Sequence, residues 1–142
     1  CRPLRRRTRR RWGGDVRRLL ILTLTTLLVC VAVCTASQIV IDRLLTRAHD
    51  MNTEIHMAME TGDETAARDG LVALATDWDE YRGILEVLCD HEDLHNVGEH
   101  IIEARICMDY TDAEDFYTAV ALIGEGIDHL MDQEKLTWSN LC

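Results

Sequence analysis

Residues 19–41 read LLILTLTTLLVCVAVCTASQIVI, a stretch of 23 residues without a charged side chain. At about 1.5 Å per residue, such a stretch forms roughly 34 Å of helix, enough to cross a hydrocarbon layer about 30 Å thick. The apolar pattern continues through Ile39, Val40 and Ile41 and runs directly into the next helical segment. The sequence therefore predicts a transmembrane anchor at 19–41, in contact with membrane lipid.

The charges on the two sides of this stretch differ in sign. Residues 1–18 contain nine Arg and a single acid, Asp15, whereas residues 42–142 contain six basic and 24 acidic side chains. Because basic flanks stay in the cytoplasm, we expect a single-pass protein of the cell membrane with residues 1–18 cytoplasmic and residues 42–142 extracytoplasmic. An acidic domain repels phosphate, which excludes nucleic acid as its partner. The alternative for the arginines, a nucleic-acid-binding or nuclear-localisation arm, is disfavoured next to a spanning segment.

A cleavable signal peptide is the competing interpretation of the N-terminal segment. Cys34, Thr35 and Ala36 supply small residues for cleavage before Ser37. We favour the uncleaved anchor because the apolar pattern resumes at once after this point. Both interpretations export the C-terminal part of the chain.

Residues 41–130 repeat apolar side chains at alternating steps of three and four, which is typical of helices that pack at shallow angles. The spacing predicts four helices, at about 38–60, 63–89, 91–109 and 112–131, the first continuing the anchor without a break. The fold class is therefore all-α, with an N-terminal transmembrane helix followed by an antiparallel bundle of about four helices. The predicted core positions are Ile41, Leu44, Ala48, Met51, Ile55 and Ala58; Leu71, Leu74, Trp78, Tyr81, Leu85 and Leu88; Leu94, Val97, Ile101, Ala104 and Met108; and Phe116, Val120, Ile123, Ile127 and Leu130.

Capping signals mark the breaks between these helices. Thr61-Gly-Asp-Glu64 and Thr111-Asp-Ala-Glu114 both match the capping box, in which a hydroxyl at the N-cap is followed by Glu three residues later. Asp90, Glu92 and Asp93 place acids where the dipole of the third helix favours them. Leu136, Trp138 and Leu141 form an apolar tail that can close one end of the bundle.

The string His91-Glu92-Asp93-Leu94-His95 matches the H-E-x-x-H pattern of zinc proteases. His100 follows one residue short of the extended pattern with a third ligand. At 100° per residue, Glu92 and His95 point about 150° away from the predicted core face, and His91 about 110° away. The triplet is therefore expected to face solvent, where no cleft excludes water. We accordingly assign no catalytic, cofactor or metal residues, with His91, Glu92 and His95 as the metal-site alternative.

The remaining histidines and cysteines carry weaker signals. His49 and His56 lie seven residues apart on a face of the first helix expected to be exposed, and His129 lies opposite the core face of the last helix. Such a pattern is typical of solvated surface, with a metal or pH sensor as the alternative. Cys89 and Cys107 are expected about 25 Å apart along the third helix, too far for a disulfide. We favour buried or half-buried thiols at Cys89, Cys107 and Cys142, with a Cys107–Cys142 or intermolecular bridge as the alternative.

Two acidic runs, Asp77-Trp-Asp-Glu80 and Asp109-Tyr-Thr-Asp-Ala-Glu-Asp115, lack the glycine and the spacing of an EF-hand loop. We expect these runs to make the surface soluble and to attract divalent cations only diffusely.

The chain resembles a family of small bacterial proteins known as domain of unknown function 4363. The similar features are the N-terminal anchor, the helix end at Thr61-Gly-Asp63, the pattern Trp78-x6-Leu85-x5-His91-x2-Leu94, and the ending Ile127-Asp-His-Leu130 with Glu134 to Asn140. The resemblance covers about residues 17–142. It implies a membrane-anchored helical envelope protein without an assigned activity, and it supplies no catalytic or binding residues.

Three classes of function follow from these observations. We favour a non-enzymatic module of the envelope that uses no cofactor, has no identified small-molecule substrate and binds another membrane or envelope protein. The alternatives are a small zinc-dependent hydrolase built on His91, Glu92 and His95, and a metal- or pH-sensing module.

Overall fold

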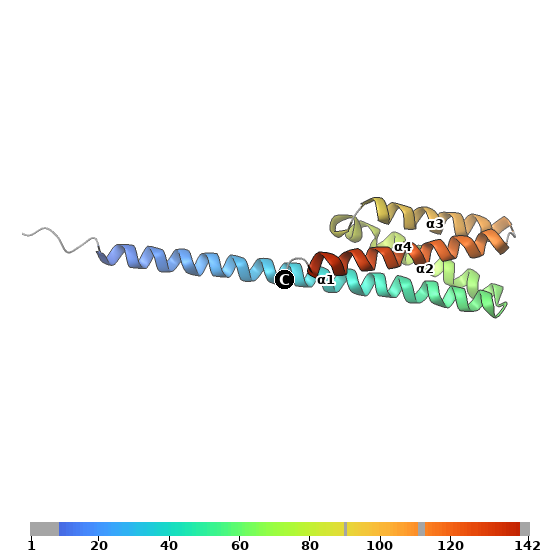
Figure 1. The fold of residues 1–142 in the computed structure, drawn as a ribbon, viewed down its shortest axis with the longest axis horizontal. Coiled ribbons are helices and arrows are strands. Elements are labelled where there is room, and N and C mark those ends of the chain that lie inside the picture. The colour runs from blue at the N-terminus through green and yellow to red at the C-terminus, as the bar shows by residue number, and fades with distance from the viewer. Residues whose placement is uncertain (1–8, 90, 111–112, 140–142) are drawn as a thin grey trace, which may run out of the picture. The chain divides into compact units, whose positions relative to one another are not determined.

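The computed structural model describes the backbone of residues 9–89, 91–110 and 113–139, and side chains within 15–89, 91–108 and 114–133. Four helices make up this part of the chain: α1 (Arg9–Glu60), α2 (Glu64–Leu88), α3 (His91–Tyr110) and α4 (Ala113–Ser139) (Figure 1). The predicted all-α class is confirmed, and α1 runs from the apolar stretch into the bundle without a break. The prediction ended the last helix at 131, but α4 continues to Ser139 because neither Gly nor Pro interrupts residues 132–139.

The chain divides into two compact units, Cys1–Ile39 and Val40–Cys142. In the first unit, every described side chain from Asp15 to Ala36 is exposed. Its hydroxyl groups are nevertheless satisfied within the helix, because each donates to a backbone carbonyl three or four residues earlier at 2.8–3.0 Å. These hydroxyls belong to Thr23, Thr25, Thr26, Thr35 and Ser37. The described part of the chain holds one helix that is long and apolar enough to cross a membrane, and it contains this segment.

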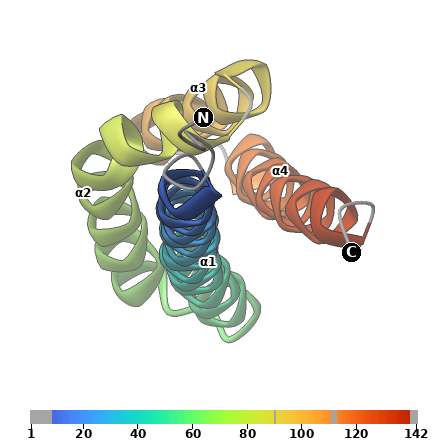
Figure 2. The ribbon, with the colours of Figure 1, turned by 90° about the vertical axis from the view of Figure 1, so that its left-hand side faces the viewer.

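The second unit is an antiparallel bundle in which α2 and α4 flank α1 and α3 completes the ring (Figure 2). Between α1 and α2, Arg47 Nε lies 2.6 Å from Asp77 Oδ2. Between α2 and α3, Arg68 donates to the carbonyl of Met108 at 3.0 Å. Sequential helices joined by such short connections have no room to run parallel, so each reverses the direction of the one before it.

The turn between α1 and α2 corrects one capping prediction. Gly62, at φ +74°, ends α1 in a Schellman motif, with its N–H bonded to Met59 O and the N–H of Asp63 bonded to Ala58 O. The N-cap of α2 is Asp63, whose carboxylate accepts from the N–H of Ala66 at 3.0 Å. Thr61 was the predicted N-cap, but its hydroxyl bonds back to the carbonyls of α1. The predicted cap at Thr111, like Asp90, lies outside the described residues.

A single apolar core runs through the bundle and confirms the predicted core faces. Trp78, Leu85, Ile101 and Ile123 are all buried in it, as expected. Fully burying one such aliphatic side chain contributes roughly 1.5–3 kcal/mol. The buried apolar residues are Ile41, Leu45, Ala48 and Ile55 from α1; Ala67, Leu71, Leu74, Ala75, Trp78 and Leu85 from α2; Leu94, Val97, Ile101 and Ala104 from α3; and Ala119, Val120, Ile123, Ile127 and Leu130 from α4.

Gly126 allows α3 and α4 to approach closely, and its replacement should measure that contact. A Cβ atom at Gly126 would lie 2.6 Å from Cγ2 of Val97, a fully buried β-branched side chain with little freedom to move. We expect Gly126→Ala to lower the free energy of unfolding by about 1–3 kcal/mol in chemical denaturation. Gly83→Ala is the control, because a Cβ there meets nothing within 4 Å. It should raise stability by up to about 1 kcal/mol, since alanine favours helix. If Gly126→Ala and Gly83→Ala changed the free energy of unfolding by the same amount in the same direction, the close contact between α3 and α4 at Gly126 would be contradicted.

Candidate functional site

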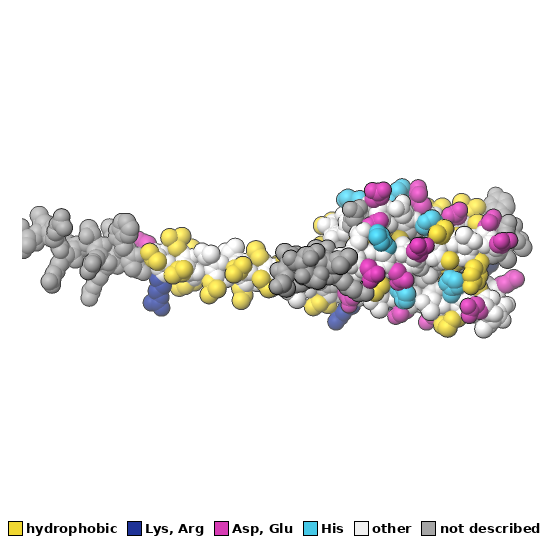
Figure 3. All heavy atoms as spheres, in the orientation of Figure 1, with side chains coloured by type: hydrophobic (Ala, Val, Ile, Leu, Met, Phe, Trp, Pro, Cys, Tyr) yellow, Lys and Arg dark blue, Asp and Glu magenta, His cyan; other side chains and the backbone are white. Residues whose placement is uncertain are grey.

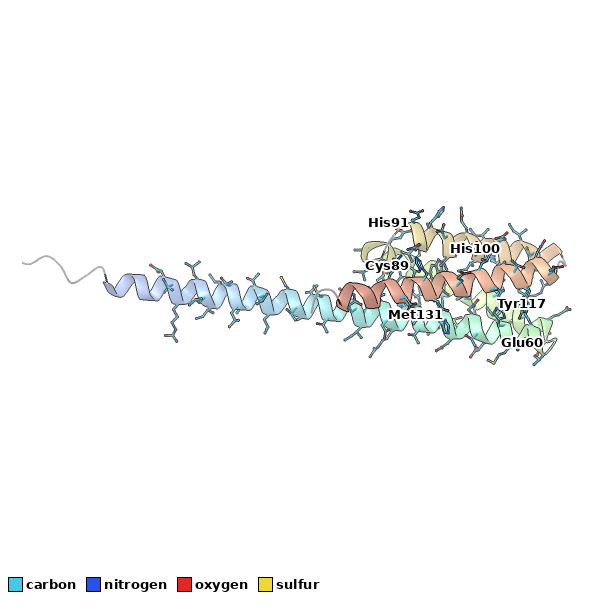
Figure 4. The ribbon with its side chains drawn as sticks, viewed as in Figure 1. Glu60, Cys89, His91, His100, Tyr117 and Met131 are labelled. Carbon is cyan, nitrogen blue, oxygen red and sulfur yellow. The ribbon has the colours of Figure 1, made fainter. Side chains whose placement is uncertain are left out.

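The His-Glu-x-x-His string occupies the first turns of α3, and its residues lie on the outside of the bundle. His91, Glu92 and His95 are all exposed, whereas Leu94 between them is buried in the core. Figure 4 shows His91 at the start of α3, directed away from the bundle. The expectation that the triplet faces solvent is confirmed. His95 Nε2 lies 3.3 Å from Glu99 Oε1, an exposed contact one turn along the same helix.

His100 does not join this string. It follows His91 by nine residues, or two and a half helical turns, and therefore lies on the opposite side of α3. The His100 ring is half-buried, and its Nδ1 lies 3.4 Å from Glu103 Oε2. Among the side chains that the structure describes, no three His, Cys, Asp or Glu residues are grouped so that they could hold a metal ion.

The histidines of α1 correct the sequence interpretation, because they contact α4 rather than forming a solvated face. His49 is half-buried, and its buried Nδ1 lies 3.0 Å from Oδ1 of Asp128, a close contact without the geometry of a hydrogen bond. Two turns further on, the half-buried ring of His56 packs edge-on against Tyr117, with ring centroids 4.9 Å apart. The prediction failed because helical spacing locates only the centre of the core face of α1. It does not show that α4 covers the edge of that face, where His49 and His56 lie.

Asn52 lies between these two histidines and is the one buried polar residue of the described core, at 5% exposure. It faces Gly124 of α4, where a Cβ atom would lie 2.7 Å from its Nδ2. Its Oδ1 has no hydrogen-bond partner among the described residues. Sequence reasoning missed Asn52, although its position four residues after Ala48 and three before Ile55 places it on the core face. The α1–α4 contact is therefore polar along His49, Asn52 and His56.

His129, on α4, is exposed as predicted. Its Nε2 lies 3.0 Å from Nε2 of Gln133 and 4.0 Å from Oδ2 of Asp93 on α3. These contacts connect neighbouring surface residues and leave the ring in solvent.

In the acidic run at the middle of α2, one acid contacts another helix and the other two face solvent. Asp77 pairs with Arg47 of α1, while Asp79 and Glu80 are exposed. Figure 3 shows acidic and histidine side chains spread over the bundle face turned to the viewer, and apolar side chains exposed along the first unit. The second acidic run lies partly outside the described residues. The described acids thus form a charged surface rather than a binding loop.

The cysteines fall into the two units as expected. Cys30 and Cys34 are exposed in the first unit, whereas Cys89 and Cys107 are half-buried in the second. No disulfide joins any two of these four residues. Cys142, which the alternative disulfide with Cys107 would need, lies outside the described residues.

Comparison with known proteins identifies the bundle. Residues 36–141 match the family described as Domain of unknown function (DUF4363). The chain belongs to the DUF4363 family. The match begins at Ala36, later than the start near residue 17 expected from the resemblance, so the DUF4363 domain of this chain corresponds to the antiparallel bundle and the turns of α1 that lead into it. No curated protein and no solved structure shows significant similarity to the chain.

Proposed function

We propose that this DUF4363 protein is anchored in the cell membrane by residues 19–41 and holds its acidic bundle outside the cytoplasm, where the bundle binds another membrane or envelope protein without catalysing a reaction. The observation that carries the proposal is the exposure of the apolar stretch. Leu, Ile and Val side chains from Leu19 to Val33 are between half and seven-tenths exposed. A contiguous apolar surface of this extent is unfavourable in water and favourable in a hydrocarbon layer.

The polar atoms of this segment support the same location. Hydrocarbon offers no hydrogen-bond partners, so a spanning helix must satisfy its polar groups internally. The hydroxyls of Thr23, Thr26 and Thr35 do so through the carbonyls of the preceding turn. The stretch therefore presents apolar surface without an unsatisfied hydroxyl.

The orientation is proposed from charge. Nine arginines and one acid precede the apolar stretch, and 24 acids with six basic residues follow it. Translocation of a segment with many arginines close to the span is disfavoured, so the N-terminus remains inside.

The non-enzymatic part of the proposal rests on how the histidines are used. The His-Glu-x-x-His string is spread over an exposed helical surface. His49 and His56, in contrast, are engaged by Asp128 and Tyr117 of α4. Catalysis by imidazole and carboxylate needs these groups to converge on a site sheltered from water.

Lys135 is the only lysine of the chain and gives a direct test of topology. In cells that express the full-length protein, an amine reagent that cannot cross the cytoplasmic membrane should modify Lys135 while that membrane is intact. The matched control combines Lys135→Arg with Arg6→Lys, which moves the only lysine to the N-terminal segment. This variant should be modified at position 6 only after the membrane is permeabilised. The reverse pattern would overturn the orientation, and release of the bundle by alkaline carbonate would overturn the anchor.

The proposed partner is tested by affinity capture of the full-length protein from detergent-solubilised membranes. The control chain carries residues 1–41 followed by an unrelated soluble domain. Proteins recovered only with the full-length chain are partners of the bundle. Identical recoveries from the two chains would contradict a binding role for the bundle.

A further inference from the structure

Two apolar side chains near the C-terminal end of α2 are exposed on the surface of the bundle. Val87 is 82% exposed, more than any other large apolar side chain described, including those of the apolar stretch, and Ile84 is 47% exposed. Both lie on the outer side of α2, away from Leu85, which is buried in the core. Other apolar side chains of the bundle, such as Ile102 at 59% and Ile106 at 53%, are also exposed, so position rather than exposure distinguishes this pair. Ile84 and Val87 are neighbours three residues apart on α2.

The register of α1 and α2 shows where this surface lies. Arg47 of α1 is level with Asp77 of α2, since the two form an ion pair of 2.6 Å. In an antiparallel pair, moving seven residues along each helix from this contact places Ile84 level with Val40. Val40 is itself 42% exposed. Ile84 and Val87 therefore lie at the end of the bundle where the uncharged stretch 19–41 finishes.

Two charges beside these residues neutralise each other, while Glu80, one turn before Ile84, is exposed. Arg82 Nε lies 2.7 Å from Oε1 of Glu86, an ion pair one turn apart on α2. Gly83 adds no side chain between them and has open space around it. The last turns of α2 thus present Ile84 and Val87 beside a neutral ion pair, which lowers the cost of bringing this end near lipid headgroups.

We propose that Ile84 and Val87 insert into the lipid interface, so that the end of the bundle formed by the last turns of α2 rests on the membrane surface. The proposal builds on the anchor proposed above. A stretch that just spans the hydrocarbon ends at the boundary between acyl chains and headgroups, and Val40 and Ile41 mark that end. Apolar side chains held at this depth move out of water and into contact with the acyl chains, as the apolar side chains of interfacial helices do.

The test uses full-length protein reconstituted in phosphatidylcholine vesicles, with one diazirine-bearing leucine analogue placed at position 28, 87 or 106. Leu28 and Ile106 are exposed, as Val87 is, so the analogue does not disturb the core at any of the three sites. Position 28 reports on the anchor. Position 106 is the matched control, because the register of α2 and α3, set by Arg68 and Met108, places it about 25 Å along the bundle from Val87.

After illumination, mass spectrometry should find phosphatidylcholine adducts at positions 28 and 87, with a yield at 87 several-fold above that at 106. Adducts at 28 together with equal, low yields at 87 and 106 would overturn the interfacial contact while leaving the anchor intact. Cross-links from 87 to a second copy of the chain would also overturn it, in favour of a contact between bundles. Failure of position 28 to label lipid would reject the anchor and with it this inference.

Discussion

Replacing Trp78 by alanine is expected to lower the free energy of unfolding of the bundle by about 3–5 kcal/mol. Trp78 is the largest side chain of the core and is 5% exposed. Its removal takes a large apolar area out of the core and leaves a cavity that the surrounding helices fill only in part. Since domains of this size are stable by about 5–15 kcal/mol, the loss is a large share of the total. The loss of unfolding free energy is measured by urea denaturation of the full-length protein in detergent, monitored by circular dichroism.

Trp78→Phe is the matched control for this prediction. Nε1 of Trp78 is buried without a hydrogen-bond partner among the described residues, so the indole N–H contributes a desolvation cost that phenylalanine does not have. Phenylalanine also keeps much of the apolar volume. We expect a clearly smaller loss than with alanine, and equal losses would mean that the indole N–H forms a bond that the native state needs.

The second large effect is expected for Ile101→Ala, at about 2–5 kcal/mol. Ile101 is buried on the core face of α3, whereas His95 and Glu92 lie on its exposed side. His95→Ala should change stability by less than about 0.5 kcal/mol, and Glu92→Ala by no more than about 1 kcal/mol, because Glu92 lies in the first turn of α3 where the helix dipole favours an acid. The three variants share one helix, so their ranking in chemical denaturation compares the core face with the exposed face directly.

A chelator makes the same experiment a test of the zinc alternative. Losing a metal ligand releases the bound ion together with the stability linked to its binding. If His95→Ala destabilised the protein as much as Ile101→Ala, and chelator abolished the difference from the unsubstituted protein, His91, Glu92 and His95 would form a metal site. A loss for Ile101→Ala alone, unchanged by chelator, is the result expected of a solvated helix start.

Much of the architecture followed from local periodicity. Each helix has a face set by its own residue spacing of about 3.6 per turn, so apolar residues at steps of three and four identify that face whichever helix covers it. The burial of Leu85 and Ile123 and the exposure of His95 were therefore predictable. The apolar stretch was equally predictable, because its length and lack of charge are properties of composition. The prediction of Thr61 as the N-cap of α2 was wrong. Gly62, at positive φ, forms the C-terminal turn of α1 after Thr61, so that Asp63 is the residue that caps α2.

The sequence by itself determined the number of helices, their core faces, the family and the asymmetry of charge around the apolar stretch. Only the tertiary structure decided what lies on the flanks of each helix: Asp128 and Tyr117 against the histidines of α1, Gly124 against Asn52, and Ile84 level with Val40. The physical reason is that a helix in this bundle has a neighbour on each side of its core face. Residues at the centre of that face are buried by any partner, whereas the environment of a flanking residue depends on which helix stands beside it and in which register.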